Sequence, residues 1–591
     1  MRFQNPSLLL PERAARAGPI STTGDSVSHT IARSTSPALA RLRPTAFAAA
    51  VAVLTLASGA ATAMELDTGN PDVAVRWDNT VRYNYAVRTE ARDSKIGNSA
   101  LSDEGDYSFD KGDAVAKRLD LLSELDVVYK KRYGFRVSGT AWHDGAYGDD
   151  SKSNPNPPLN GIPSYVGKKY SGLVKRLYGQ GGELLDAFVF GGFDAGDVPV
   201  QAKAGRHTLY WGESLFLGGH MHSIAYAQNP LDLQKGFATP GVEAKELFRP
   251  LNQLSAQAQV TDTVSVAGQY LLEWEPARYP EGGTYLGPVD FVFNGPDRQF
   301  VSAALGFASR APASEPKQNG ELGLSARWSP KALDGTVGFY YRRFADKLPQ
   351  TLITKVAPAS GSQYNMIYTD KIDLYGVSIA KNIAGVSVGG EISYRHNTPL
   401  NSQVLGVAPG LPGQGQTKGA RGDTVHALVN GAGAIARTPV FDQATWATEL
   451  AWSQYTKVRS GANLFNAIGY APCNNKDKFD GCATKNYVGA SFAFTPTWFQ
   501  VFPGVDLSAP MSYAVGLSGN AATVFGGNQG LGNYAVGVSA DVQQKYRFDL
   551  KYIDYVGRYK DNGTAAVTAT NGLTTFLKDR GFVSLTFKTT F

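Results

Sequence analysis

The fold is decided by the stretch 581–591, which reads GFVSLTFKTTF. Apolar and polar side chains alternate along it, so that Val583 and Phe587 share one face while Ser584 and Lys588 share the other. This is the two-residue period of a β-strand, because successive side chains of a strand point to opposite faces. The stretch therefore predicts a strand with one apolar side, either at the edge of a soluble β-sandwich or in the wall of a membrane barrel.

The composition favours the barrel. The stretch stops at an aromatic residue, Phe591, with no polar tail, which resembles the assembly signal of bacterial outer-membrane β-barrels. The 591 residues include 65 Gly and 29 Tyr, and they contain no run of the ~20 apolar residues that a membrane helix requires. These features exclude a helical membrane protein and favour an all-β chain whose strands face two different media.

A secretory signal is predicted near the amino terminus. The apolar run 45–58 follows two arginines and precedes the small residues 61–63, which predicts cleavage after Ala63. We therefore divide the chain into residues 1–63, a lead and signal peptide, and residues 64–591, a β-barrel that we expect in the outer membrane.

The rest of the chain repeats one rhythm of long connection, strand, short turn and strand. The alternation in 73–88 is too long for an ordinary globular strand and suits a tilted transmembrane strand. Long connections rich in Gly, Pro, Ser and Asn are expected at 143–182, 211–251, 276–320, 346–370, 397–422, 455–485, 518–532 and 557–578. We predict a single transmembrane antiparallel β-barrel of about 16 to 18 strands, with short periplasmic turns and long extracellular loops.

Several charged residues occupy the polar face of these strands and are predicted to face the lumen. They are Arg76, Arg82, Arg136, Arg327, Arg395 and Glu391. Two cysteines, Cys473 and Cys482, lie in a polar loop, and in an exported chain they predict a disulfide. A metal site at the neighbouring Asp477 and Asp480 is the weaker alternative, since calcium prefers about six to eight oxygen ligands. We expect no metal and no cofactor.

Candidate catalytic groups are few. The pattern G-x-S-x-G at 385–389 lies within an alternating strand, whereas a nucleophile elbow needs a turn leading into a helix, so Ser387 is read as a lumen residue. His220 and His222 lack a third metal ligand nearby and are read as polar loop histidines. His207 with Ser214 is the one pairing that a hydrolase could use.

The segment 205–252 differs from the other connections. It is long, lacks alternation and is rich in Trp, Phe and Leu, so it is too apolar for an idle exposed loop. We predict that it folds inward and partly fills the lumen, as a plug or constriction. The alternative is an ordered cap on the rim of the barrel.

This segment makes the sequence recognisable. The run G-R-x-x-x-x-W-G-E-S from Gly205, the motif N-P-x-D at 229–232, the motif P-G-x-E-x-K-E at 240–246, and the strands 504–508 and 579–585 resemble the DUF1302 family. The resemblance implies an outer-membrane barrel, often encoded near an RND-type exporter and a periplasmic lipid-binding protein, and traffic of lipid-like or sterol-like molecules.

We therefore expect outer-membrane transport of hydrophobic or amphipathic compounds rather than an enzyme. The alternatives are a water-filled diffusion pore for small polar or ionic solutes, an outer-membrane hydrolase and an adhesive barrel. Residues predicted to bind cargo or form the constriction are Arg206, Trp211, Glu213, Ser214, Phe216, Glu243, Lys245 and Glu246. Expected partners are outer-membrane lipid, a hydrophobic or amphipathic small molecule, the RND-type exporter and the periplasmic lipid-binding protein. The formal net charge of +6 includes arginines of the signal region, so nucleic-acid binding is not expected.

Overall fold

The computed structural model describes residues 64–591 except 240–243, 357–360, 404–417, 562 and 568–569. The predicted lead and signal peptide at 1–63 and the candidate residue Glu243 lie outside the described residues.

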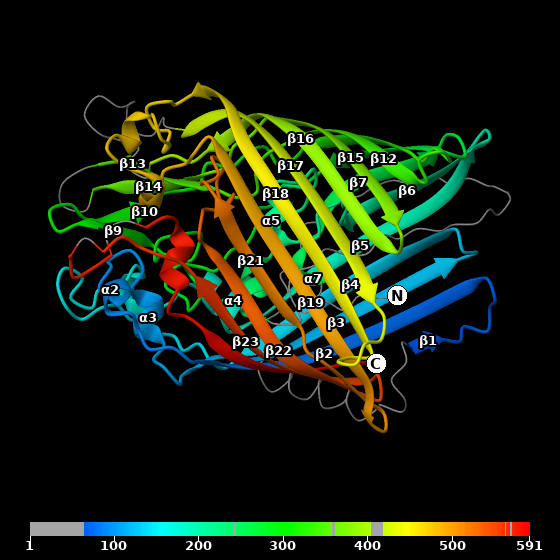
Figure 1. Cartoon of the computed structure of the whole chain (residues 1–591), viewed down its shortest axis with the longest axis horizontal. Coiled ribbons are helices and arrows are strands. Elements are labelled where there is room, and N and C mark those ends of the chain that lie inside the picture. Colours follow the sequence, from blue (N-terminus) through cyan, green and yellow to red (C-terminus); the bar gives the residue numbers. More distant parts are fainter. Residues whose placement is uncertain (1–63, 240–243, 357–360, 404–417, 562, 568–569) are drawn as a thin grey trace, which may run out of the picture.

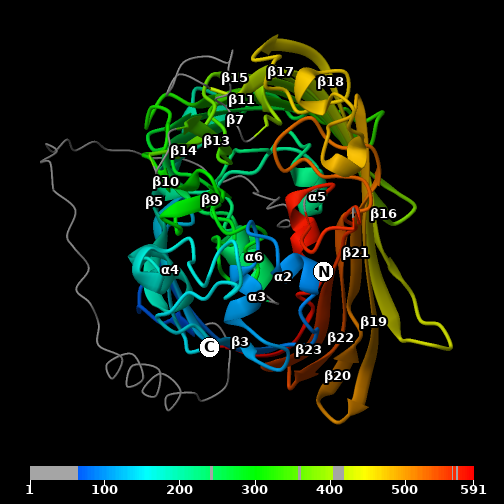
Figure 2. The ribbon, with the colours of Figure 1, turned by 90° about the vertical axis from the view of Figure 1, so that its left-hand side faces the viewer.

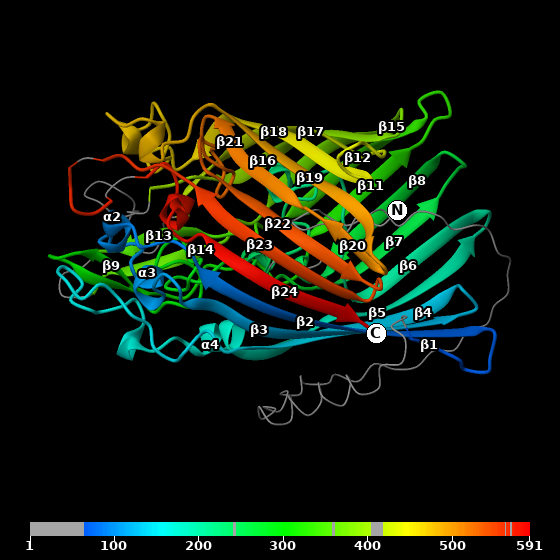
Figure 3. The ribbon, with the colours of Figure 1, turned by 60° about the horizontal axis from the view of Figure 1, so that its bottom comes forward.

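One antiparallel sheet forms the wall and closes on itself, because β24 (Phe582–Thr590) pairs with β2 (Val73–Arg88). Figure 3 shows these two strands side by side. In the described residues the sheet has 20 strands, of which β1 (Met64–Leu66) only pairs with the first residues of β2, while β20 (Val505–Ser508) and β21 (Met511–Ser518) form one broken strand. The wall is therefore a closed 18-strand barrel, at the upper end of the predicted range.

The other strands of the wall follow in chain order. They are β3 (Ala114–Tyr129), β4 (Tyr133–Asp144), β5 (Gln180–Ala195), β6 (Val198–His207), β7 (Leu251–Gln259), β8 (Val264–Leu271), β11 (Leu322–Trp328), β12 (Gly335–Phe344), β15 (Ile372–Ile383), β16 (Val386–Leu400), β17 (Ala420–Ile435), β18 (Gln443–Ser460), β19 (Asn486–Phe502), β22 (Gly532–Val542) and β23 (Tyr546–Val556).

Long and short connections alternate strictly around the barrel, as the sequence predicted. The long ones are 89–113, 145–179, 208–250, 272–321, 345–371, 401–419, 461–485, 519–531 and 557–581. They gather at one end, called the loop end, whereas the short turns and the carboxyl terminus lie at the other, called the turn end (Figure 1).

The wall is apolar outside and polar inside. On β16, Ile392 is 53% exposed whereas its neighbour Glu391 is buried, and on β18 Leu450 is exposed whereas Glu449 is buried. A water-soluble sandwich would bury its apolar face. The exposed apolar outer face of this wall is unfavourable in water and favourable in a lipid bilayer. The soluble alternative is therefore excluded, and the barrel has the architecture of an outer-membrane protein.

The loops carry elements of their own at the loop end. A small sheet contains β9 (Arg298–Ser302), β10 (Gly306–Arg310), β13 (Gln350–Lys355) and β14 (Gln363–Ile367). The short helices outside the segment 208–250 are α2 (Ser94–Gly97), α3 (Glu104–Ser108), α4 (Gly172–Tyr178), η1 (Val166–Lys168), η2 (Ala471–Cys473), η3 (Lys478–Asp480) and η4 (Leu573–Leu577). The main hydrophobic core joins these loops to the inner face of the barrel through residues such as Trp274, Phe291 and Tyr364.

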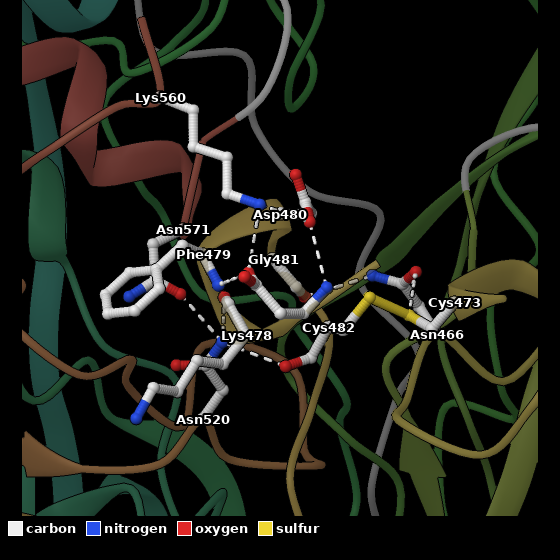
Figure 4. Close-up of a disulfide and its surroundings, with 11 residues drawn as sticks. Asn466, Cys473, Lys478, Phe479, Asp480, Gly481, Cys482, Asn520, Lys560 and Asn571 are labelled. Carbon is white, nitrogen blue, oxygen red and sulfur yellow. Dashed lines mark hydrogen bonds and ion pairs between the residues drawn. A yellow bond between two sulfur atoms is a disulfide. The ribbon is translucent and has the colours of Figure 1, made fainter. Parts of the chain in front are cut away.

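The predicted disulfide is present between Cys473 and Cys482 in the loop 461–485 (Figure 4). Beside it, Lys560 Nζ lies 3.1 Å from a carboxylate oxygen of Asp477 and 2.7 Å from one of Asp480. These are the two carboxylates considered above for a metal site. In the structure a lysine from the loop 557–581 pairs with both of them. Two loops that are distant in sequence are thereby joined at the loop end.

Residues 208–239 and 244–250 lie inside the ring of strands (Figure 2). This segment leaves β6 and returns to β7, whose residues His207 and Leu251 are direct partners in the sheet. Between them it forms α5 (Leu217–His220), α6 (Leu233–Ala238) and α7 (Ala244–Leu247). We call its described residues, 208–239 and 244–250, the plug. The inward fold is as predicted, and the alternative of a cap on the rim is wrong.

Candidate functional site

Two acidic side chains of the wall hold the backbone N–H groups of the plug. Glu391 on β16 accepts hydrogen bonds from the backbone nitrogens of Glu213 and Ile224, each at 3.3 Å. Glu449 on β18 accepts from Leu215 at 2.7 Å and Phe216 at 3.1 Å. The wall thus supplies acceptors where the plug has donors but no strand or helix partner of its own.

Two arginines of the wall hold the backbone carbonyl groups of the plug. Arg395 on β16 donates to the carbonyl oxygens of Met221 and Ser223, both at 3.0 Å. Arg342 on β12 donates to those of Ile224 at 2.9 Å and Tyr226 at 2.7 Å. All four clamp residues, Glu391, Glu449, Arg342 and Arg395, are buried. Because unpaired backbone groups are costly away from water, these clamps fix the path of the plug.

Ion pairs attach the second half of the plug to β2, β3 and β5, which come from the first part of the chain. Glu246 on α7 accepts two hydrogen bonds from Arg82 of β2, at 2.9 and 3.0 Å, and both residues are buried. Lys235 on α6 lies 3.1 Å from Glu183 of β5. The half-exposed Lys245 pairs with Glu124 of β3. The plug is therefore anchored to strands from both halves of the chain.

The plug histidines lie in the long connection between β6 and β7, as expected, and both are buried. His222 donates through Nε2 to the carbonyl of Gly526 at 2.8 Å, which leaves its Nδ1 to accept from Nδ1 of His426 at 3.0 Å. His220 stacks on Tyr210 instead. Burial lowers the pKa of each plug histidine to about 3, and Arg395 adds to the effect. Both histidines are neutral at physiological pH and serve packing.

The groups considered for catalysis do not meet. His207 bonds to Ser255 at 2.8 Å, whereas the Ser214 hydroxyl bonds to Tyr210. Ser387 pairs within the sheet with residues of β15 and β17, as a strand residue should. Among the described residues, no group of three or more His, Cys, Asp or Glu is placed to hold a metal ion.

A chamber of about 530 Å³ separates the plug from one side of the wall. On the plug side it is lined by Phe216, Leu217 and Met221 of the first half and by Leu233 and Phe237 around α6. On the wall side it is lined by small residues of β19, β21 and β22, such as Ser491 and Ala514. The outer loops contribute Phe525 and Leu573. Figure 2 shows α5 inside the ring of strands on the side of β21, and residues of both elements line the chamber.

Most of the residues predicted to bind cargo or form the constriction make contacts that hold the plug in place, and a role in cargo binding stays a prediction. Glu213 accepts a hydrogen bond from Ser378 at 3.2 Å, and Trp211 packs against Tyr340 of the wall. Arg206 is paired with Glu273 and Glu275 of the connection 272–321. Of the predicted set, Phe216 is the one described residue that lines the chamber. Sequence reasoning missed the loop residues of the chamber, such as Phe525, because nothing in a single sequence shows which loop tips meet.

The predicted lumen charges fall into two groups. Arg82, Arg395 and Glu391 are buried against the plug. Arg76 and Arg136 lie nearer the turn end, where the Arg76 side chain is 51% exposed and Arg136 pairs with Asp126 and Asp186. Arg327, also in that half, is partly exposed.

Comparison with known proteins finds one family model, described as "Protein of unknown function (DUF1302)", which matches residues 44–591. Similar solved structures include OccAB2 of Acinetobacter baumannii, with 11% identity, a TM-score of 0.40 and coverage of 88% of this chain and 98% of that one. A BenF-like porin from Pseudomonas fluorescens Pf-5 is 9% identical, with a TM-score of 0.36 and coverage of 89% and 99%. No curated protein matches the chain.

Proposed function

The chain belongs to the DUF1302 family, and we propose that it carries hydrophobic or amphipathic compounds, lipid-like or sterol-like in character, across the outer membrane through this plugged barrel. The observation that carries the proposal is the chamber between the plug and the wall. It places an apolar cavity inside the lumen of a transmembrane barrel, where an ordinary diffusion pore would hold water.

The size and lining of the chamber suit such a cargo. A volume of about 530 Å³ falls within the roughly 300–1,000 Å³ of small-molecule pockets. Phe216, Phe237 and Phe525 supply aromatic contact, and Leu573 and Leu577 supply aliphatic contact. Such walls with a few polar groups are typical of sites that bind a largely apolar ligand.

The rival function is a water-filled diffusion pore, whose charged lumen side chains would have to be accessible to permeating ions. Glu391, Glu449, Arg342 and Arg395 are instead bonded to the plug backbone. The exposed charges of the turn half favour a wet vestibule below the plug. A vestibule alone does not make a continuous pore.

The partners implied by the family resemblance have a place in this scheme. Such a vestibule would open at the turn end, which would face the periplasm. A periplasmic lipid-binding protein and an RND-type exporter would deliver or collect the cargo there.

The proposal is tested by filling the chamber. We expect cells that express the protein to take up the hydrophobic dye N-phenyl-1-naphthylamine faster than cells that lack it. The variant Ala514→Trp, which places a large ring in the chamber, should return the rate to the background. Ala74→Trp, at the turn end of β2, serves as the matched control and should leave uptake unchanged. Equal uptake with and without the intact protein would contradict the proposal.

A further inference from the structure

We propose that the chamber admits amphiphiles whose polar group is uncharged and discriminates against carboxylates. This inference rests on the proposed transport function and names the chemical class of its cargo.

The first observation is the charge of the lining. The described residues that line the chamber include no Lys, Arg or His, and they include two acids, Glu449 and Asp480. A ligand carboxylate would therefore lose its hydration without gaining a cationic partner, which is costly in a largely apolar cavity. The acids would add repulsion at short range.

The two acids are also unsuited to binding a cationic ligand, because their charges already have partners. Glu449 accepts from the backbone nitrogens of Leu215 and Phe216 and from the side chain of Asn430. Asp480 is paired with Lys560 at 2.7 Å. A cationic ligand would have to displace these partners, so an uncharged polar group is the best match.

The second observation is a set of neutral polar side chains on one side of the chamber. Ser512 on β21, Asn533 on β22 and Asn528 in the loop 519–531 all line it. In the described part of the chain, none of these three side chains makes a hydrogen bond within the protein. Hydroxyl and amide groups can both donate and accept, so together they suit a ligand hydroxyl, ether or carbonyl group.

The positions of these side chains explain how both ends of an amphiphile could be held. Asn533 pairs in the sheet with Ala514, and Ser512 pairs with Ala535, so the two polar residues lie on neighbouring strands. Leu573 and Leu577 come from η4 in a different loop, and Phe216 comes from the plug. The chamber therefore combines one polar patch with apolar walls, as recognition of an uncharged amphiphile requires.

The test uses two water-soluble probes that differ in charge but share a ring system, 2-naphthol and 2-naphthoate. Binding to the full mature barrel in lipid nanodiscs is measured by calorimetry at pH 7, with empty nanodiscs subtracted. We expect 2-naphthol to bind at least tenfold more tightly than 2-naphthoate.

Adding a cation to the chamber should reverse this preference. Ser512→Lys is expected to strengthen 2-naphthoate binding at least tenfold, and Asn533→Lys provides a second position in case one variant fails to fold. Ser387→Lys is the matched control, since it adds the same charge to a lumen-facing residue near the turn end. Its probe binding should equal that of the unaltered protein.

A failure of the charge preference and a failure of the proposed transport function give different results. Binding of 2-naphthoate within threefold of 2-naphthol, with no gain in Ser512→Lys or Asn533→Lys, would overturn the charge preference and leave the transport proposal intact. Binding of neither probe, together with no effect of Ala514→Trp on dye uptake, would overturn both.

Discussion

The loop half and the turn half of the lumen carry the same kinds of charged side chain in different surroundings. In the loop half, Arg395 and Glu391 are buried and bonded to the plug backbone. In the turn half, the side chain of Arg76 is about half exposed and Arg136 bonds to acids of neighbouring strands. The same strands pass through both halves, so the difference comes from what fills the lumen.

The comparison shows that a lumen-facing charge has no fixed role in a barrel of this kind. Where the plug is present, an arginine or glutamate of the wall makes the hydrogen bonds that the plug backbone would otherwise make to water. Where the plug is absent, as at Arg76, the same residue type remains about half exposed to water and its pair with Asp78 is worth little. The following predictions test this contrast, beginning with the largest expected effect.

Removing one clamp arginine should cost far more than removing an arginine of the turn half. Arg395→Ala leaves two plug carbonyls without their charged donor, and at roughly 1.5–3 kcal/mol for each bond the loss is about 3 kcal/mol or more. Arg327→Ala should change stability by less than about 0.5 kcal/mol. The midpoint of urea unfolding in lipid vesicles measures both. Equal shifts in the two variants would contradict the contrast.

Two adjacent residues of α7 give a closer comparison. Glu246→Gln breaks the buried pair with Arg82, and loss of one partner of a buried pair costs about 3–5 kcal/mol. Lys245→Gln removes a half-exposed pair with Glu124 and should cost at most about 1 kcal/mol. Limited proteolysis within the plug, compared between the variants, would show which one releases it. Faster cleavage in Lys245→Gln than in Glu246→Gln would refute this ranking.

Acid should weaken the loop half through the plug histidines. Burial lowers the pKa of His220 and His222 from the ordinary 6.5 to about 3. Above pH 6.5 these histidines do not change the free energy of unfolding with pH. That free energy falls as the pH drops from 6.5 towards 3, because only the unfolded chain takes up protons in that range. Each histidine contributes about 1.4 kcal/mol per pH unit below 6.5.

The pH dependence is measured as the urea midpoint between pH 7.5 and 5. The double variant His220→Gln and His222→Gln should show a smaller loss on acidification than the unaltered protein. Parallel pH profiles would mean that the two histidines do not cause the effect.

The wall was predictable from sequence, whereas the detailed site was not. Strict alternation along 73–88 and 581–591, with long and short connections in turn, identifies a closed barrel because the two faces of each strand meet different media. The inward fold of 205–252 followed from its length and apolar content. The disulfide was predicted because Cys473 and Cys482 lie in one polar loop of a chain expected to be exported.

The roles of individual plug residues required the three-dimensional register. The sequence allowed Glu213 and Glu246 either to orient a polar ligand group or to lock the loop, and the structure places Ser378 and Arg82 beside them, as the second role requires. The chamber depends on loop tips such as 523–528 and 570–577, whose proximity follows from the closure of the barrel. Local patterns carry no information about such contacts.

We infer that the plug closes the barrel. This closure is tested by conductance in a planar lipid bilayer, comparing the chain from Met64 onward with a variant in which residues 208–250 are replaced by a short Gly-Ser linker. The linker is feasible because His207 and Leu251 are already paired in the sheet. We expect a nearly silent intact barrel and a steady, large conductance in the variant. A steady open conductance in the intact protein, unchanged by the replacement, would contradict it.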